Sequence, residues 1–297
     1  MIIVKLMGGL GNQMFQYAAA RRLAHCRNAE LKLDRSYLEG SQDGCTPRSF
    51  QLGELNIAAA TASSEEITWI TMPVRSRMKL LRLRLGRILG LNGAPPTRLR
   101  ERHFHFDPQI LTAPDNVHLE GYWQSERYFA DIGDVIRGEF ACRAPLSGKN
   151  LELAGEIRSC NSVSLHVRRG DYVTSRTTSE THGTCGMDYY LRCIGELAGT
   201  LPDLRLFVFS DEPQWAREEL KTGLPRVIVD HNGPEGAHDD LRLMSLCRHN
   251  IIANSSFSWW GGWLNANPGK IVFAPEKWLT DTSHDTSDVI PASWRKR

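Results

Sequence analysis

The stretch IIVKLMGGLGNQMFQYAAARRLAH, residues 2–25, indicates an α/β fold because its pattern changes twice along its length. Residues 2–6 form an apolar run of strand length, and the glycines within residues 8–11 predict a turn. Residues 13–25 then carry apolar side chains on one helical face, namely Met14, Tyr17, Ala18 and Leu23. A strand, a glycine turn and a helix in this order are typical of the start of a parallel sheet.

The same alternation continues through the rest of the chain. Further strands are predicted at residues 31–33, 162–167, 205–209, 227–229, 250–253 and 271–274. Helices are predicted at residues 187–198, 214–220, 239–247 and 257–265. We therefore expect parallel sheets covered by helices on both faces. A polar stretch at residues 144–161 predicts a boundary between two domains, residues 1–150 and 151–297.

The composition excludes several classes of protein. With 41% hydrophobic residues in a chain of 297, a large core is possible, and a net charge of +2 is too small for nucleic-acid binding through bulk charge. The 7 cysteines lack CxxC spacing, which indicates reduced thiols rather than a disulfide framework. No secretory signal precedes the first strand and no apolar run is long enough to span a bilayer, so we predict a cytoplasmic protein.

Residues 67–100 stand apart because they contain no Asp or Glu and many arginines. Apolar residues at positions 74, 78, 81, 85 and 88 follow the spacing of one helix face. Such a helix either packs on the core with a solvated basic face or lies on an anionic membrane surface. In the second case, residues 74–91 would hold the protein peripherally on the inner face of the membrane.

The segment HVRRGDY, residues 166–172, places two arginines directly after a predicted strand. Ligands of open α/β sheets bind at these carboxyl ends of strands. The guanidinium group of Arg168 or Arg169 suits a diphosphate, because it offers a planar fork of donors and keeps its charge. Gly170 permits a sharp turn, after which Asp171 either orients an arginine or acts as a carboxylate of the site. Taken alone, the segment is explained as well by an exposed Arg–Asp pair of little energetic value.

The glycine segment GGLGNQ, residues 8–13, lies between the first predicted strand and helix. Its glycines, Gly9 and Gly11 among them, let backbone amides approach a ligand, and the start of a helix favours negative charge. The GxGxxG and P-loop patterns are both absent. What is left is a tight turn with two side-chain amides, Asn12 and Gln13, that are able to bind hydroxyl groups.

Two further segments follow predicted strands. In FSDEPQW, residues 209–215, Asp211 either caps the next helix or accepts hydrogen bonds from a guanine edge, and the sequence leaves both open. In ANSSFSWWGGW, residues 253–263, Ser255 and Ser256 are expected to cap a helix and to offer hydroxyl and amide groups to a phosphate. The tryptophans of this segment are expected to be core residues.

No metal site is predicted. His103 and His105 alternate as on one face of a strand, but no further ligand completes the set. The DxD pattern with which many sugar transferases hold a metal is absent, since Asp239 and Asp240 are adjacent. Bound phosphates are therefore expected to be neutralised by arginine and by helix amides.

Together and in this order, the segments resemble the family-11 glycosyltransferases, the bacterial and animal α-1,2-fucosyltransferases. The resemblance covers nearly the whole chain and includes GYWQSERYF, residues 121–129. HxRRxD is shared more widely with α-1,6- and protein O-fucosyltransferases and therefore points to GDP-fucose. The family adds fucose to terminal galactose in O-antigen repeats or in host-like blood-group structures, and the chain resembles the bacterial O-antigen type.

This resemblance implies a GT-B-like pair of Rossmann-type domains facing a cleft, with the acceptor on the N-terminal domain and GDP-fucose on the C-terminal one. It implies an inverting, metal-independent transfer of L-fucose from GDP-β-L-fucose to the 2-hydroxyl of a terminal β-galactose. The residues it implies are Gly9, Gly11 and Asn12 near the transferred sugar, Arg168 on the diphosphate, His166 and Asp211 on the guanine side, and Ser255 and Ser256 on phosphate.

The expected mechanism follows from charge. As the bond between the sugar and GDP breaks, negative charge develops on GDP, and Arg168 stabilises it more in the transition state than in the ground state. The attacking hydroxyl needs a proton acceptor, for which the candidates are Asp171 and Glu126, and the sequence does not choose between them.

Two alternatives share these features. One is a transferase that uses another GDP-sugar, since contacts to guanine and diphosphate do not distinguish one sugar from another. The other is a GDP-sugar-binding protein without transfer activity. The sugar beneath the acceptor galactose depends on loop residues around 174–185, and a lipid-linked acceptor would explain the basic segment at residues 74–91.

Overall fold

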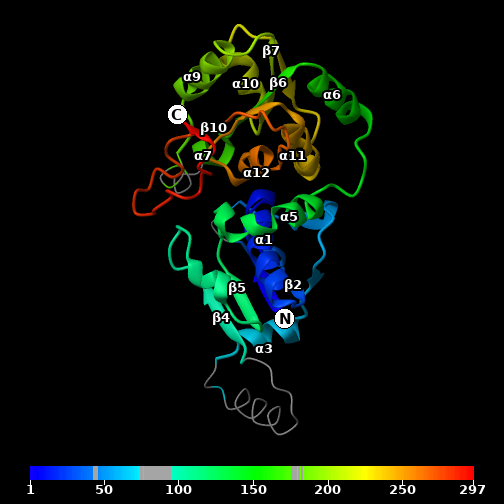
Figure 1. The fold of residues 1–297 in the computed structure, drawn as a ribbon, viewed down its shortest axis with the longest axis vertical. Coiled ribbons are helices and arrows are strands. Elements are labelled where there is room, and N and C mark those ends of the chain that lie inside the picture. Colours follow the sequence, from blue (N-terminus) through cyan, green and yellow to red (C-terminus); the bar gives the residue numbers. More distant parts are fainter. Residues whose placement is uncertain (43–45, 74–75, 77–94, 175–178, 180, 182) are drawn as a thin grey trace. The chain divides into compact units, whose positions relative to one another are not determined.

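The computed structural model describes residues 1–42, 46–73, 76, 95–174, 179, 181 and 183–297. Within this part the chain divides into two compact units, Met1–Phe140 and Ala141–Arg297 (Figure 1). The division precedes the predicted boundary at residue 150, because the polar stretch at 144–161 contains helix α6 (Gly148–Ser159), which packs within the second unit. The predicted basic helix at residues 74–91 lies outside the described residues, except for Ser76.

The first unit is built on a parallel sheet with strand order β3-β2-β1-β5-β4. Its strands are β1 (Ile2–Lys5), β2 (Leu31–Asp34), β3 (Ala60–Thr61), β4 (Thr97–Arg100) and β5 (Val117–Glu120). Its helices are α1 (Leu10–Arg27), α2 (Ser36–Glu39), α3 (Ser64–Thr71) and α5 (Gly133–Glu139). Short 3-10 turns are η1 (Leu52–Glu54), η2 (Pro108–Thr112), η3 (Glu126–Tyr128) and η4 (Ala130–Ile132).

The second unit is also built on a parallel sheet, with strand order β11-β10-β9-β6-β7-β8. Its strands are β6 (Asn161–Val167), β7 (Leu204–Ser210), β8 (Arg226–Val229), β9 (His249–Ile251), β10 (Val272–Ala274) and β11 (Arg295–Lys296). Its helices are α6, α7 (Gly170–Thr174), α9 (Met187–Ala198), α10 (Pro213–Glu219), α11 (Ala237–Leu246) and α12 (Ser256–Leu264), with the 3-10 turn η5 (Pro234–Gly236).

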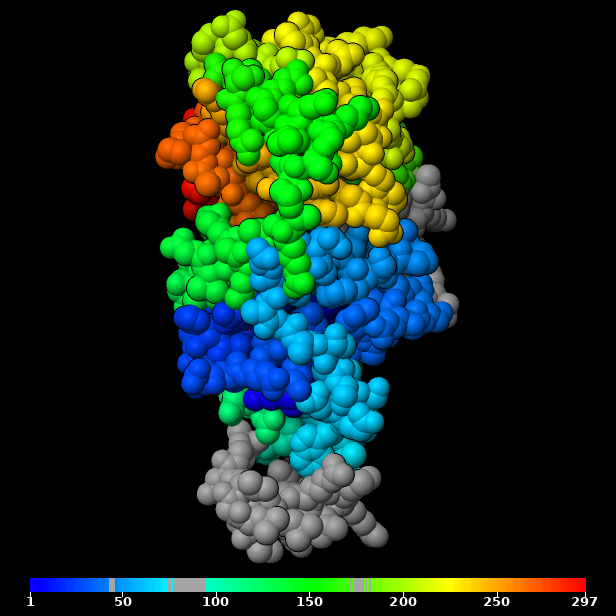
Figure 2. Space-filling view, turned by 90° about the vertical axis from the view of Figure 1, so that its right-hand side faces the viewer, coloured from blue at the N-terminus to red at the C-terminus, as the bar shows by residue number. Residues whose placement is uncertain are grey.

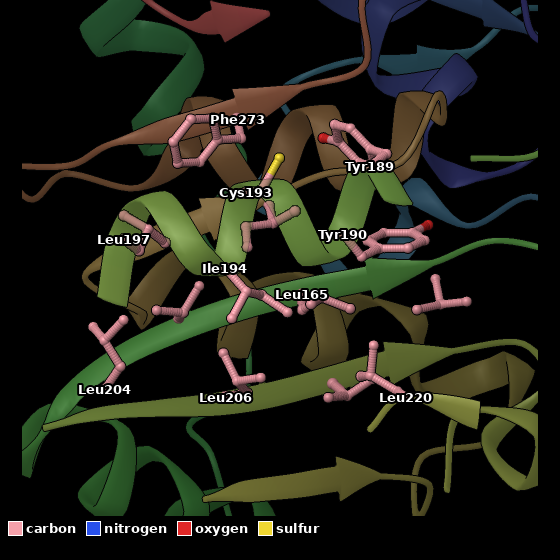
Figure 3. Close-up of a cluster of buried hydrophobic side chains, with 14 of the residues drawn as sticks. Leu165, Tyr189, Tyr190, Cys193, Ile194, Leu197, Leu204, Leu206, Leu220 and Phe273 are labelled. Atoms are coloured by element: carbon pink, nitrogen blue, oxygen red, sulfur yellow. The ribbon is translucent and has the colours of Figure 1, made fainter. Parts of the chain in front are cut away.

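The central strands of the second unit bury both faces, as the apolar runs predict. In β7, Leu206 and Val208 pack with α9, whereas Phe207 and Phe209 pack with α6 and α11 on the opposite face. Figure 3 shows α9 lying over β6, with Ile194 directed at the strand. Figure 2 shows α6, in green, on the surface of the second unit. The sheet is therefore covered on both sides, as parallel sheets require.

The alternation of strands and helices predicted from the sequence is confirmed, with ends that differ by a few residues. Helix α9 matches its predicted range, and the apolar stripe of α1 is buried throughout. Strands β3, β4, β5 and β11 were not predicted. Arg98 and Arg100 of β4 are surface residues paired with Glu120 of β5, so β4 carries no apolar run. Among the described residues no helix is long and apolar enough to cross a membrane.

Candidate active site

The site residues of the second unit lie where its chain order reverses. Strand β6 pairs with β7 on one side and with β9 on the other, and all three run parallel. Ligands of open α/β sheets bind at the carboxyl ends of strands at such a reversal. His166 and Arg168 are at the carboxyl end of β6, Asp211 follows β7, and Ser255 and Ser256 follow β9. The fold therefore places these predicted residues along one edge of one sheet.

Arg168 and Arg169 are held by different carboxylates. The Nη1 atom of Arg168 lies 2.9 Å from Oδ2 of Asp211, and its guanidinium lies over the ring of Tyr172. Arg169 instead pairs with Glu212 at 3.1 Å and lies over the ring of Trp215. Since the side chains of Arg168 and Asp211 are each about one-fifth exposed, their charges stay accessible to a ligand.

Asp211 does not cap helix α10, so the capping interpretation of this residue was wrong. Glu212 occupies the N-cap position of α10 and makes no side-chain cap hydrogen bond. The Oδ1 atom of Asp211 accepts a hydrogen bond from the backbone amide of Arg169 at 3.0 Å. Together with the ion pair to Arg168, this bond ties the loop after β6 to the loop after β7.

A glycine is required at position 170 because the carboxylate of Asp211 lies close to its backbone. A Cβ atom at this position would lie only 2.5 Å from Oδ2 of Asp211. The glycine in HVRRGDY therefore leaves room for the carboxylate that holds Arg168. Asp171 is the next residue of α7, and its side chain lies outside the described part of the protein.

His166 is buried and neutral. Burial, with a smaller contribution from the charge of Arg168, lowers the pKa of His166 to about 3. Its Nδ1 atom is buried and has no hydrogen-bond partner within the described part of the chain, and its ring centroid lies 5.7 Å from that of Phe257. A buried polar atom without a partner costs free energy unless a ligand or water satisfies it.

The depressed pKa of His166 predicts a loss of stability in acid. Between about pH 6.5 and 3 the unfolded chain binds a proton that the folded protein does not, so stability falls as the pH falls through this window. Between pH 7 and 4.5 the wild type is expected to lose roughly 2–3 kcal/mol more of its unfolding free energy than His166→Gln. Urea unfolding at a series of pH values measures this difference, and parallel pH curves would contradict it.

Ser255 does not cap α12 with its side chain, contrary to expectation. It occupies the N-cap position with no side-chain cap hydrogen bond, and Ser256 is the first residue of the helix. The neighbouring Asn254, which the sequence analysis did not identify, anchors this corner. Its Nδ2 atom donates to the carbonyl of Gly183 at 3.2 Å, and its own carbonyl accepts from the hydroxyl of Tyr172 at 3.3 Å.

A partly buried polar network at the end of β8 was also not predicted from the sequence. Asn150 of α6 donates to Asn232 and to Asp239, each at 2.9 Å, and its Oδ1 atom lies 2.7 Å from Nε2 of His231. Asn232 in turn donates to Asp240 at 2.8 Å. Burial raises the pKa of Asp240 to about 7, although the bond from Asn232 opposes the shift. The network fixes the start of α11 at the carboxyl edge of the sheet.

The site residues of the first unit also lie at a reversal of chain order. Strand β1 pairs with β2 and with β5, so the glycine segment after β1 lies beside residues 121–124 after β5. Gly9 is the N-cap of α1, and Gly11 and Asn12 lie in its first turn. Glu126 is half-buried at the start of η3. The structure thus groups these four residues in the first unit and the remaining predicted site residues in the second.

Gln13 is structural, contrary to the expectation that it binds hydroxyl groups. It is fully buried, and its Nε2 atom donates to the carbonyls of Gly8 and Ser49, each at 2.8 Å. Its Oε1 atom accepts from the amide of Gln51 at 2.9 Å. Both donors of the Gln13 side-chain amide are therefore used within the protein, so of the two amides in the segment GGLGNQ it is Asn12 that keeps a donor for a ligand.

His103 and His105 do not lie on a strand. Their rings stack with centroids 4.4 Å apart, in the segment that follows β4. Among the described residues no group of three or more His, Cys, Asp or Glu side chains is arranged to hold a metal ion.

Comparison with known proteins identifies the family. The profile of Glycosyl transferase family 11 matches residues 102–296. The Escherichia coli O-antigen biosynthesis glycosyltransferase WbnK is 34% identical over 97% of this chain and 98% of its own length. An Escherichia coli alpha-1,2-colitosyltransferase is 33% identical over 99% of this chain and 97% of its own length.

The fold is shared with a solved structure. Arabidopsis thaliana FUT1, determined as a mutant in complex with GDP, aligns with a TM-score of 0.53 over 93% of this chain and 71% of the other, at 14% identity. At this identity the match supports the fold alone, and it confirms the predicted GT-B-like architecture of two α/β units. From the profile match and the two bacterial relatives, the chain belongs to glycosyl transferase family 11.

Proposed function

We propose that the protein transfers L-fucose from GDP-β-L-fucose to the 2-hydroxyl of a terminal β-galactose, with inversion at the sugar carbon. The observation that carries the proposal is the Arg168–Asp211 pair, which holds a guanidinium at the carboxyl end of β6 where the chain order reverses. A Caenorhabditis elegans galactoside 2-alpha-L-fucosyltransferase, which is 26% identical over the whole of this chain and 79% of its own length, supports the transferred sugar and the linkage.

The second unit is proposed to bind the donor. Arg168 supplies a charge-assisted hydrogen bond to the diphosphate, and Ser255 and Ser256 offer backbone amides at the start of α12. The neutral imidazole of His166, with its unpartnered Nδ1 atom, and the carboxylate of Asp211 are proposed for the guanine side. No step of this proposal requires a metal, because arginine and helix amides carry the positive charge.

The chemical step breaks the bond between C1 of fucose and the β-phosphate oxygen, and the electron pair leaves with GDP. The galactose O2 atom forms the new bond to C1 from the opposite face, and its proton passes to Asp171 or Glu126. Arg168 stabilises the charge that develops on the leaving phosphate. Gly9, Gly11 and Asn12 of the first unit are proposed to contact the transferred sugar.

A second candidate donor is GDP-colitose, since one relative of nearly full length is named a colitosyltransferase. Colitose is fucose without its 3-hydroxyl, so the two donors differ by a single group. A site that hydrogen-bonds that hydroxyl rejects the deoxy sugar strongly, whereas a site that does not bond it discriminates weakly. The acceptor is proposed to be a galactose-terminated O-antigen repeat, with a lipid-linked repeat at the inner face of the membrane as one form.

The proposal is tested by following GDP release from GDP-fucose and GDP-colitose, with and without a β-galactoside disaccharide, in the presence of EDTA. We expect release that depends on the acceptor, is insensitive to EDTA and is faster with GDP-fucose, with fucose on O2 of galactose in the product. Faster release from GDP-colitose would establish the second candidate. Tight GDP-fucose binding without release across a panel of galactosides would indicate a binding protein.

A further inference from the structure

The turn at residues 121–124 is strained and closely packed. Trp123 adopts a φ of 55°, in the left-handed region that a bulky residue rarely enters, yet it is fully buried. A Cβ atom on Gly121 would lie 2.4 Å from Cβ of Glu101 and 2.8 Å from the ring of Trp123. Strained backbone of this kind persists only where the surroundings hold it, and it gathers at functional sites.

Glu101 holds this turn. Its carboxylate accepts hydrogen bonds from the backbone amides of Tyr122 at 2.7 Å and Trp123 at 2.9 Å. Burial raises the pKa of Glu101, while the bonds from these two amides oppose the shift. The carboxylate thus fixes two successive amides directly before Gln124.

The fixed turn sets the hydrogen bonding of Asn12. The Nε2 atom of Gln124, whose side chain is buried, donates to Oδ1 of Asn12 at 2.9 Å. The Asn12 amide lies against Gly8, where a Cβ atom would be 2.5 Å from Nδ2. Asn12 is half-buried, and its Nδ2 atom has no hydrogen-bond partner among the described residues.

We propose that Gln124, held by the Glu101-bound turn, is a positioning residue that fixes Asn12 as a hydrogen-bond donor toward the sugar substrate. An asparagine amide can present either its oxygen or its NH₂ group, and occupation of Oδ1 by Gln124 leaves the NH₂ group for the ligand. Asn12 therefore donates to a substrate oxygen and does not accept the proton of the attacking hydroxyl. The inference rests on the proposed function only in that the ligand is a sugar.

Turnover tests this with two variants of similar size, Gln124→Glu and Gln124→Met. The ionised carboxylate introduced by Gln124→Glu only accepts, so it draws the NH₂ group of Asn12 toward itself and turns Oδ1 to the substrate. A methionine removes the bond without reversing it. At pH 8 we expect kcat to fall roughly tenfold to a hundredfold in Gln124→Glu and less in Gln124→Met, with KM for the donor little changed.

The pH profile separates positioning from general disruption. Position 124 is buried, and burial raises the pKa of a carboxyl group. Once protonated, the carboxyl group of Gln124→Glu can again donate a hydrogen bond to Asn12. The deficit in kcat of Gln124→Glu relative to wild type is therefore expected to shrink as the pH falls from about 8 to about 5.5. The deficit of Gln124→Met is expected to stay constant. A deficit of Gln124→Glu at pH 8 that is no larger than that of Gln124→Met would overturn the proposal.

A matched pair of stability measurements needs no activity at all. Asn12→Asp keeps an acceptor for Gln124, whereas Gln124→Glu removes the donor that Asn12 accepts from, and each adds one carboxylate. If Gln124 donates to Asn12, as proposed, Asn12→Asp is expected to have a higher Tm than Gln124→Glu. The reverse order would overturn the proposal. If the wild type prefers another donor, the proposed function fails, while the reverse order of Tm would still overturn the proposed direction of the bond.

Discussion

Arg168→Ala is expected to lower kcat about 100- to 1000-fold, which corresponds to roughly 2.7–4 kcal/mol of lost transition-state stabilisation. The reason is that Arg168 presents its guanidinium at the carboxyl end of β6, where the leaving diphosphate of GDP is proposed to bind. Negative charge on that group grows as the glycosidic bond stretches, so the arginine contributes more in the transition state than in the ground state. Steady-state GDP release with saturating acceptor measures the effect.

Arg169→Ala is the matched control, because it removes the same group one residue away. Arg169 pairs with Glu212 and lies over Trp215, so it is not proposed to contact the donor. This variant is expected to keep most of its turnover. Arg168→Lys keeps the charge but loses the planar fork, and an intermediate activity is expected. Wild-type turnover in a folded Arg168→Ala variant would remove Arg168 from the proposed mechanism.

Much of the fold could be predicted because the central strands are apolar along their whole length. Strand β6 has an apolar run and helix α9 has apolar residues at helical spacing, and these local patterns were enough to predict their positions closely. Strand β4 could not be predicted in this way, since its arginines are stabilised by Glu120 on a strand that is distant in sequence. Polar residues at a sheet edge depend on such neighbours, which a local pattern does not reveal.

The site shows the same division between local and long-range information. The residues at the carboxyl ends of β6, β7 and β9 were predicted because each follows an apolar run directly. The partners of these residues were not predicted. Asp211 was considered as a helix cap, but it accepts a hydrogen bond from the backbone amide of Arg169 in the loop after β6. Glu101 and Gln124 act on residues that are distant in the chain, and no sequence motif links them to their partners.

Gly170→Ala is expected to lower kcat/KM roughly tenfold to a hundredfold without unfolding the protein. The added methyl group would lie 2.5 Å from Oδ2 of Asp211, so the carboxylate must move. Asp211 holds both the guanidinium of Arg168 and the backbone amide of Arg169, and its displacement releases the arginine from its position. GDP release at low donor concentration measures the loss, and thermal unfolding shows whether the fold is retained.

Gly155→Ala is the control for this substitution, because the same methyl group is added in helix α6 of the same unit, where it meets no atom within 4 Å. It is expected to leave activity unchanged and to raise stability by about 0.5–1 kcal/mol, as alanine does in a helix interior. In an Asp211→Ala background, Gly170→Ala should add little further loss, since the two changes act through one contact. A full additional loss in that background would mean that Gly170 acts on the site by another route.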